Sequence, residues 1–155
     1  MEQITILCSI EFLQWEELSG EEQQLLEAAK EATQGSYAPY SQFFVGAALR
    51  LQNDSIVIGN NQENASYPCG LCAERTALFA ANSQYPNLMV SAIAIAARNA
   101  DGFLKTPITP CGSCRQVMLE VEHRQNAPMK IYLYGENGVY RINSSADLLP
   151  LQFSL

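Results

Sequence analysis

Basic residues are scarce in this chain. Its 155 residues include 9 Lys and Arg against 16 Asp and Glu, which gives a formal net charge of −7 and a pI near 4.6. Proteins that bind nucleic acid or anionic membranes without sequence preference need a basic surface. We therefore expect no nucleic-acid and no membrane partner, whereas a small polar ligand is compatible with this charge.

Long apolar runs and a secretory signal are also missing. No hydrophobic segment is long enough to span a bilayer, and residues 1–7 carry neither a basic segment nor a cleavage site. With 48% hydrophobic and 16% charged residues, the composition is that of a folded protein. We expect one cytoplasmic domain over residues 1–155, with residues 1–20 as an extension whose role the sequence does not indicate.

Hydrophobic periodicity predicts three main helices and a short final one. The first begins with a capping box, in which Ser19 and Glu22 satisfy each other's backbone N–H groups. The helices are expected over about residues 20–33, from 72 to about 82, from just after Pro110, and in a short segment capped by Ser144.

Five strands are expected from apolar runs bounded by turn residues. Residues 43–51 and 56–58 form a hairpin around the turn at 53–55, and the continuous apolar run at 90–97 is typical of a strand covered on both faces. Residues 130–134 and 139–142 flank a glycine-containing turn, residues 3–13 are a weak candidate for an edge strand, and 98–110 read as a loop.

The order of these elements favours an α/β architecture. A central mixed five-stranded sheet with helices on both faces, in three layers, accommodates it best. Right-handed crossovers would bring the second and third helices to start at the same end of the sheet. Each of these two helix starts carries cysteines, so we expect the cysteines to converge there.

The cysteine spacing indicates a zinc site. Four of the five cysteines form two Cys-x-x-Cys pairs, and thiols in the cytoplasm stay reduced and bind metal more often than they form disulfides. Thiolates are the ligands that zinc prefers in tetrahedral sites. The pairs are Cys69 with Cys72 and Cys111 with Cys114, and the fifth cysteine is Cys8.

Two kinds of zinc site fit this spacing. All four paired cysteines could close a structural site, which is the usual outcome of two such pairs. Alternatively, three thiolates could leave the fourth position to water. Glu74 favours the open site, because it follows Cys72 by two residues and could approach the metal without ligating it, although an acidic residue in the first turn of a helix is common for dipole reasons alone.

Several segments together carry a recognisable combination of motifs. They are residues 61–67 (Asn-Gln-Glu-Asn-Ala-Ser-Tyr), 72–75 (Cys-Ala-Glu-Arg) and 110–116 (Pro-Cys-Gly-Ser-Cys-Arg-Gln), with further matches at 43–49 and 148–150. Over about residues 22–153 the chain resembles the cytidine deaminases of the small homotetrameric class. The first ligand of the zinc-deaminase signature is a cysteine here rather than a histidine, and the single histidine, His123, is expected on the surface.

The resemblance implies the cytidine-deaminase-like three-layer α/β/α fold and a zinc-dependent deamination. One zinc per subunit would be held by Cys72, Cys111 and Cys114, and zinc-activated water would attack C4 of the pyrimidine while ammonia leaves. Glu74 would take a proton from the water, deliver it to ring N3 and later help to protonate the leaving amine. Arg75 would offset the negative charge of the thiolates, although a solvated helix residue is the alternative at that position.

The resemblance also implies a nucleoside substrate, cytidine or 2′-deoxycytidine, in pyrimidine salvage. Phe43 would stack on the base, Ala65 would offer backbone contacts to it, and Asn61 and Glu63 would hold the ribose 3′-hydroxyl. An amide and a carboxylate suit a hydroxyl and repel phosphate. Tyr67 would lie at the site of a neighbouring subunit, because sites are shared across subunits in the homotetramer.

Other interpretations stay open at this level. Cys69 is not a usual ligand of the family, and as a fourth ligand it would displace the water. Phe153 aligns with an aromatic residue that reaches a partner's site, but only two residues follow it. A non-catalytic zinc-stabilised interaction module is the main alternative function, and a deaminase acting on an aminonucleoside antibiotic or a free base is another.

Overall fold

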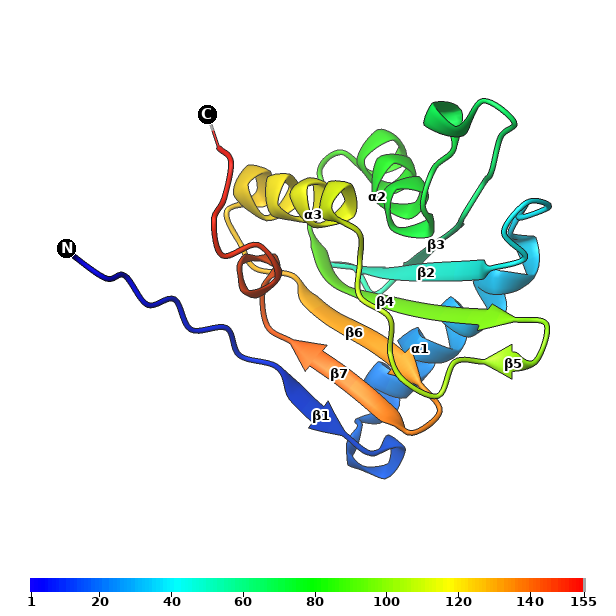
Figure 1. Ribbon diagram of the computed structural model, residues 1–155, viewed down its shortest axis with the longest axis horizontal. Helices are drawn as coiled ribbons and strands as arrows, with labels where there is room; N and C mark the ends of the chain where they lie inside the picture. Colours follow the sequence, from blue (N-terminus) through cyan, green and yellow to red (C-terminus); the bar gives the residue numbers. More distant parts are fainter. Residues whose placement is uncertain (155) are drawn as a thin grey trace.

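A mixed β-sheet forms the centre of the structure, a computed structural model that describes residues 1–154. Its strands are β1 (Glu11–Leu13), β2 (Phe44–Leu51), β3 (Ile56–Asn60), β4 (Val90–Asn99), β5 (Gly102–Phe103), β6 (Lys130–Gly135) and β7 (Gly138–Ile142). They follow the order β1-β7-β6-β4-β2-β3, and β5 pairs with the end of β4 (Figure 1). Only the β4–β6 pair is parallel among the described strands, because a long crossover joins them.

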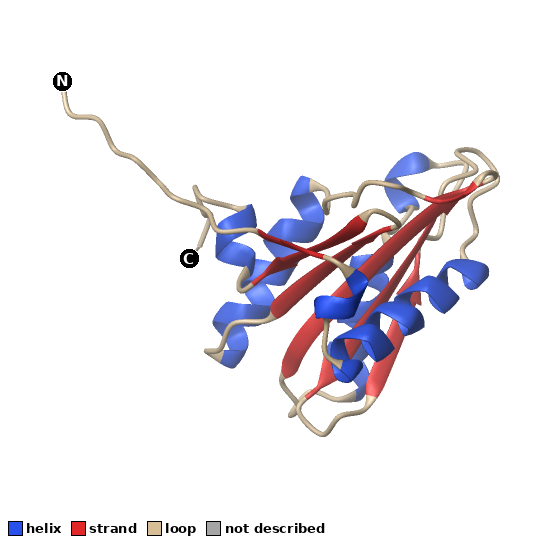
Figure 2. Ribbon diagram, turned by 90° about the horizontal axis from the view of Figure 1, so that it is seen from below, coloured by secondary structure: helices blue, strands red, loops and turns tan. Residues whose placement is uncertain are grey.

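Helices cover both faces of the sheet. The α-helices are α1 (Gly20–Ala32), α2 (Ala73–Gln84) and α3 (Gly112–Gln125), and the 3-10 helices are η1 (Trp15–Glu17), η2 (Thr33–Gly35), η3 (Tyr67–Cys69) and η4 (Ser145–Leu148). Helix α1 packs on one face, and α2 and α3 pack side by side on the other (Figures 1 and 2). The expected three-layer α/β/α arrangement is therefore confirmed. No helix within residues 1–154 is both long and apolar enough to cross a membrane.

The expected count of five strands is wrong, because the sheet has seven. The segment 98–110, expected to be a loop, folds back at Gly102, whose φ of 122° suits glycine, and Phe103 then pairs with Arg98. The candidate edge strand at residues 3–13 shrinks to Glu11–Leu13, which pairs with β7. The last helix is a single 3-10 turn, η4.

Close packing on both faces fixes where the helices lie. In β4 the side chains alternate in size: Ile93 and Ile95 face α2 and α3, while the alanines between them face α1. Glycines permit the closest contacts. A Cβ at Gly46 would collide with the backbone of α1 at Ala29, and a Cβ at Gly59 would collide with the backbone of α2 at Ala77. The first turns of α2 can therefore lie directly on β3.

Residues 11–18 of the N-terminal extension pack onto the body of the protein. Phe12 makes an edge-to-face contact with Tyr140, their ring centroids 5.6 Å apart, and Leu18 is buried. Lys30 of α1 lies among the rings of Trp15, Phe103 and Tyr134, with its Nζ 4.9–5.7 Å from their centroids. The extension thus adds an edge strand and an aromatic cover at the end of α1.

The capping box at the start of α1 is confirmed and belongs to a larger network. The Glu22 carboxylate accepts a hydrogen bond from the Ser19 N–H at 2.8 Å, and the Ser19 hydroxyl accepts one from the Glu22 N–H at 3.3 Å. The same carboxylate also accepts from the Tyr132 hydroxyl at 2.8 Å and from the Arg141 guanidinium at 3.2 Å. Burial alone would raise the pKa of Glu22, but these hydrogen bonds outweigh it and lower the pKa.

We expect Glu22→Gln to lower the free energy of unfolding by about 1–2 kcal/mol at neutral pH, because one capping hydrogen bond and two hydrogen bonds between α1 and the sheet lose their charged acceptor. A carboxylate with a lowered pKa stabilises the folded state above its unfolded pKa, and this stabilisation is lost as the pH falls through the folded value. The difference between variant and parent should therefore shrink below the ordinary glutamate pKa of 4.5.

Urea unfolding of both proteins across that pH range measures the difference. Glu21→Gln is the matched control, since Glu21 stands in the same helical turn but is exposed. Equal losses from the two substitutions at neutral pH would contradict a special role for Glu22.

Candidate active site

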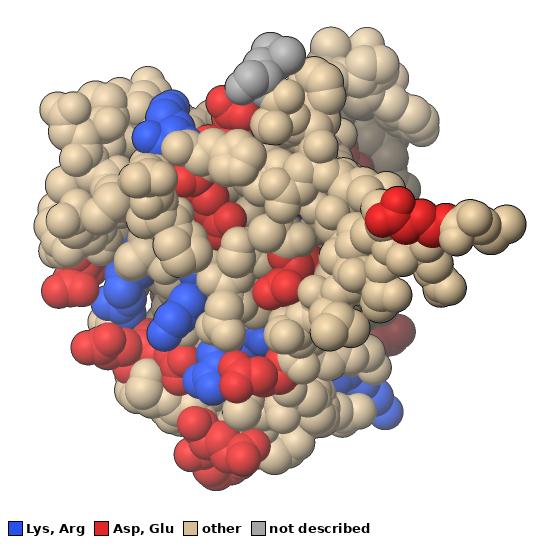
Figure 3. Space-filling model, turned by 90° about the vertical axis from the view of Figure 1, so that its left-hand side faces the viewer, with Lys and Arg blue, Asp and Glu red and all other residues tan. Residues whose placement is uncertain are grey.

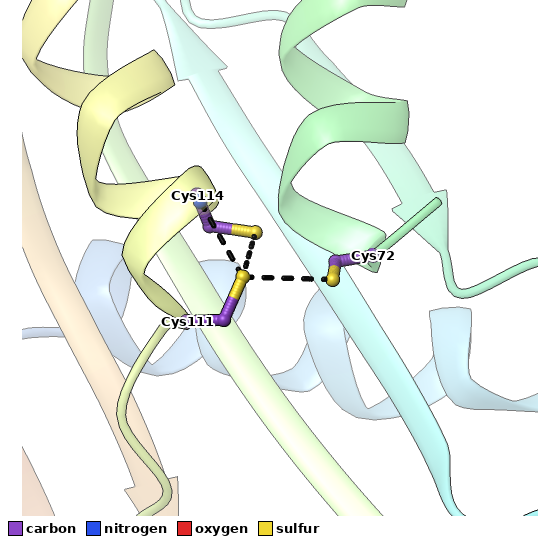
Figure 4. Close-up of side chains that lie close together, drawn as sticks. All are labelled: Cys72, Cys111 and Cys114. Carbon is purple, nitrogen blue, oxygen red and sulfur yellow. Dashed lines mark hydrogen bonds between the residues drawn. The ribbon is translucent and has the colours of Figure 1, made fainter. Parts of the chain in front are cut away.

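Two helix N-termini meet at one end of the sheet, as the cysteine pattern predicted. Cys72 is the N-cap residue of α2, and Cys111 is the N-cap residue of α3. Cys114 lies in the first turn of α3, and its N–H donates to the Cys111 sulfur at 3.4 Å. In Figure 4 the three sulfurs point toward one another from the two helices. Helix N-termini stabilise negative charge, which favours thiolates at these positions.

The three sulfurs have a spacing that suits zinc. All lie within 4.8 Å of one another. Tetrahedral ligands about 2.3 Å from a zinc ion stand roughly 3.8 Å apart. Cys72 Sγ and Cys111 Sγ are 3.8 Å apart, and Cys111 Sγ and Cys114 Sγ are slightly closer at 3.2 Å. The donor set is soft and can be fully deprotonated, so its chemistry also fits this metal.

Cys69 does not join this group. It is exposed at the end of η3, and within residues 1–154 the possible metal ligands that gather here are the three other cysteines of the two pairs. The arrangement of the sulfurs thus corresponds to the open site with three thiolates rather than to the closed site with four. His123 is exposed in the last turn of α3, as expected.

The surroundings of the cysteine cluster favour the thiolate form of Cys72. Hydrogen bonding with Cys114 lowers the pKa of Cys72 to about 5, and Arg75 and Cys111 contribute in the same direction. Arg75 Nη2 donates to Cys72 Sγ at 3.5 Å. Hydrogen bonding with Cys72 and burial raise the pKa of Cys114. Arg75 Nε is buried and has no hydrogen-bond partner among the described residues, so the hydrogen bond from Nη2 to Cys72 is the one that the guanidinium makes with the cluster here.

Glu74 lies two residues after Cys72, in the first turn of α2, and is only 4% exposed. A glutamate at a helix start is usually solvated, but this one is turned into the protein. Burial raises its pKa, and the negative charge of Cys72 acts in the same direction. A buried carboxyl with a raised pKa beside a cluster of possible metal ligands is a candidate for acid–base chemistry.

A pocket of about 830 Å³ opens over these groups. Its size is in the range that holds a small ligand. Of the residues singled out from the sequence, those that line the pocket are Phe43, Asn61, Glu63, Tyr67, Cys72, Glu74, Arg75 and Cys111. Cys114 is buried behind Cys111, and Ala65 is exposed in the neighbouring loop without lining the pocket.

Asn61 and Glu63 face the same side, as their alternation predicted. Both hydrogen-bond the segment that enters β2. Asn61 Oδ1 accepts from the Val45 N–H at 2.9 Å, and Asn61 Nδ2 donates to the Phe43 carbonyl at 2.8 Å. The Glu63 carboxylate accepts from the backbone N–H groups of Tyr40 and Ser41 at 2.9 and 3.2 Å. Hydrogen bonding from Ser41 is the main reason that the pKa of Glu63 is lowered.

Sequence reasoning missed several lining residues: Tyr40, Ser41, Leu71, Ile108 and Thr109. Ile108 and Thr109 directly precede Pro110 and Cys111, so their place beside a metal-ligating helix start could have indicated them. Tyr40 and Ser41 are brought to the pocket by the hydrogen bonds of Glu63, for which the sequence offers no local signal.

Comparison with known proteins identifies the family. The family model described as "Cytidine and deoxycytidylate deaminase zinc-binding region" matches residues 19–127. A cytidine deaminase of Halalkalibacterium halodurans is 44% identical over 132 residues, which cover 85% of this chain and 93% of the relative. The chain belongs to the cytidine deaminase family. The resemblance seen in the sequence motifs is therefore confirmed.

Solved structures agree with this assignment. The crystal structure of a cytidine deaminase from Burkholderia pseudomallei is 43% identical, has a TM-score of 0.70, and matches 84% of this chain and 97% of its own. That of a cytidine deaminase from Mycobacterium tuberculosis is 33% identical with a TM-score of 0.66, covering 85% of this chain and 96% of its own. The chain is accordingly a hydrolytic deaminase, and the cysteine cluster belongs to the zinc-binding region of its family.

Zinc analysis of two serine variants tests which cysteines bind the metal. We expect Cys69→Ser to keep the zinc content and turnover of the parent, because Cys69 is exposed and lies outside the cluster. Cys72→Ser should lose zinc on dialysis against a chelator, since a hydroxyl is a far weaker ligand than a thiolate. The measurement is zinc per chain by atomic emission. Loss of zinc from Cys69→Ser would instead indicate the four-thiolate site.

Proposed function

We propose that this protein hydrolyses cytidine and 2′-deoxycytidine to uridine and 2′-deoxyuridine, releasing ammonia, in pyrimidine salvage. One observation carries the proposal: the buried carboxyl of Glu74 and two members of the three-cysteine cluster line the same pocket as Asn61 and Glu63. Metal ligands, an acid–base group and hydroxyl-binding groups are thus gathered in one site, which is the combination that nucleoside deamination needs.

Cys72, Cys111 and Cys114 would hold one zinc ion per subunit. When bound, zinc lowers the pKa of a water molecule and makes it a nucleophile at neutral pH. Three thiolates against one divalent cation leave the site negative, which works against ionisation of that water. Arg75 beside Cys72 and the two helix N-termini reduce this negative charge, and we assign this role to Arg75.

Glu74 would carry the protons of the reaction. It would take a proton from the attacking water and give it to N3 of the pyrimidine, while the water oxygen bonds to C4 and makes C4 tetrahedral. It would then take the proton of the new C4 hydroxyl and pass it to the amino group, so that the C4–N bond breaks, C4 becomes a carbonyl carbon and ammonia leaves. One carboxyl can serve as base and acid because each proton that it removes is one that it returns. Its burial keeps water from competing for these transfers.

The residues that line the pocket support a nucleoside as the substrate. Phe43, which lines the pocket, would stack on the base, and backbone groups near Ala65 would contact the base edge. Asn61 and Glu63 would bind the ribose 3′-hydroxyl, since a carboxylate accepts the hydroxyl's hydrogen bond strongly. The negative charge of Glu63 would repel a phosphate on the same sugar, so a nucleoside is preferred over a nucleotide.

We further propose a homotetramer in which sites are shared across subunits. Tyr67 is 76% exposed at the rim of the pocket and contacts Tyr40 edge-to-face, with ring centroids 6.0 Å apart. Phe153 is also exposed, on the C-terminal tail. Aromatic side chains left bare around a pocket are typical of surfaces that a partner subunit covers. The number of subunits comes from the family resemblance.

Nucleic acid and membranes are not proposed as partners. The net charge is −7. On the face seen in Figure 3, acidic side chains stand beside basic ones, and the basic ones do not form a continuous patch. A cytoplasmic location is part of the same proposal, because thiols stay reduced in the cytoplasm and are then free to bind a metal.

A non-catalytic zinc module is the alternative from a different class. It would need the cysteine cluster but not a pocket above it. Nor would it need a buried carboxyl, because burying a group that tends to ionise lowers stability and a purely structural zinc module gains nothing in return. The burial of Glu74 therefore favours the enzyme.

We expect Glu74→Gln to retain zinc and to lose at least about 10²-fold in kcat, because proton transfer is removed while the thiolate ligands stay. Loss of absorbance from cytidine measures turnover, and zinc is determined on the same sample. Glu31→Gln, an exposed glutamate of α1, is the matched control and should behave like the parent. Near-parental turnover by Glu74→Gln would contradict the proposed mechanism.

A screen over cytidine, 2′-deoxycytidine, cytosine and cytidine monophosphate tests the substrate class. We expect the two nucleosides to be deaminated and the free base and the nucleotide to be poor substrates. In Glu63→Gln, kcat/KM for cytidine should fall roughly tenfold with the loss of one charge-assisted hydrogen bond, whereas kcat/KM for cytosine should not change. An equal loss for both compounds would show that Glu63 does not bind the sugar.

A further inference from the structure

Arg115 connects the segment that precedes α3 to η4 near the C-terminus. Its side chain is half-buried, and its guanidinium group makes three hydrogen bonds outside its own helix. Nε donates to the Pro110 carbonyl at 2.8 Å, Nη2 to the Thr109 hydroxyl at 3.1 Å, and Nη1 to the Leu148 carbonyl at 2.9 Å. Two acceptors thus lie in the segment before Cys111, and the third lies at the end of η4.

The segment before Cys111 has few hydrogen bonds other than those from Arg115. Residues 106–110 lie outside any helix or strand, and within residues 1–154 they make no backbone–backbone hydrogen bond. The side-chain hydrogen bonds to this part of the described chain are the two from Arg115. Yet the segment forms one wall of the pocket through Ile108 and Thr109 and leads into Cys111. Without Arg115, its position would rest on packing alone.

Helix η4, which Arg115 binds through Leu148, is itself held to α3 by further hydrogen bonds. Helix η4 is anchored at its start by Glu122, which stands two turns beyond Arg115 on α3 and is buried. The Glu122 carboxylate accepts from the hydroxyls of Ser144 and Ser145 at 2.8 and 2.7 Å, and from the backbone N–H groups of Ser145 and Met129 at 3.0 and 2.8 Å. With Arg115 bound to Leu148, η4 is held to α3 at both ends.

We propose that Arg115 is a positioning residue that fixes the Thr109–Cys111 segment to η4 and so keeps the Cys111 sulfur in the cluster and Thr109 in the pocket wall. The proposal rests on the zinc site described under the proposed function. An arginine suits this task because its planar fork presents donors in several fixed directions. A lysine has one ammonium group and cannot reach the three acceptors together. Groups that orient a metal ligand commonly change metal affinity 10–100-fold when they are removed.

Zinc release from the native holoprotein tests the proposal without depending on turnover. The rate is followed with a chromogenic chelator for the parent, Arg115→Lys and Arg115→Met. We expect both variants to release zinc about 10–100-fold faster than the parent. Arg124→Lys and Arg124→Met are the matched controls: Arg124 is on the same helix but exposed, and it bonds Asn82 of α2. These controls should release zinc at the parental rate.

A milder pair of variants covers the case in which Arg115→Met does not fold. Thr109→Val removes one of the three acceptors with little change in shape, and Thr109→Ser retains it. Faster zinc release from the valine variant and parental release from the serine variant would support the proposal. Parental release from Arg115→Met, or equal release from the two Thr109 variants, would overturn it. Absence of cytidine turnover in the parent would refute the proposed function. The zinc-release rates would still test the role of Arg115, because they do not depend on turnover.

Discussion

The convergence of two helix N-termini on one point is the constraint on which the rest of this structure depends. Three cysteine sulfurs can approach within 4.8 Å only if α2 and α3 start side by side at one end of the sheet. Gly59 makes this possible, because any Cβ there would push α2 away from β3. On α3, the N-cap position of Cys111 brings its sulfur within hydrogen-bond distance of the Cys114 N–H. The ordinary packing of helices on a sheet therefore sets the geometry of the ligands.

The pocket is assembled around this point by side chains that bind backbone rather than one another. Asn61 and Glu63 hold the chain that enters β2, which carries Phe43, and Arg115 holds the chain that enters α3, which carries Cys111. Both entering segments are irregular, so neither can hold its shape through ladder hydrogen bonds. Polar side chains from neighbouring elements supply the missing partners, and this is how loops of the pocket become rigid enough to bind a small ligand.

The sequence indicated those features of the fold and the site that depend on residues close together in the chain. Ser19 and Glu22 form a capping box within one turn, and the cysteine pairs mark helix starts, because the spacing of such residues reflects helical geometry directly. It could not reveal the hydrogen bonds from Tyr132 and Arg141 to Glu22, because these join segments that are distant in the chain. The strand β5 pairs locally with the end of β4, but its two residues are too few to show a strand pattern. The roles expected for Phe43, Ala65 and Tyr67 came from the family resemblance, since a single aromatic or alanine carries no signal of its own.

The same arrangement of charged groups lowers the pKa of Cys72 and raises the pKa of Glu74. Hydrogen bonding with Cys114 and with Arg75 favours negative charge on the sulfur of Cys72 and lowers its pKa. That same negative charge, after burial, helps to raise the pKa of Glu74 two residues away. A site with neutral histidine ligands would lack this second effect. In the proposed mechanism, thiolate ligation would thus work against ionisation of a water molecule at the metal, whereas the same negative charge raises the pKa of the neighbouring carboxyl. Our proposal therefore assigns more of the catalytic work to Glu74 than a site with neutral ligands would require.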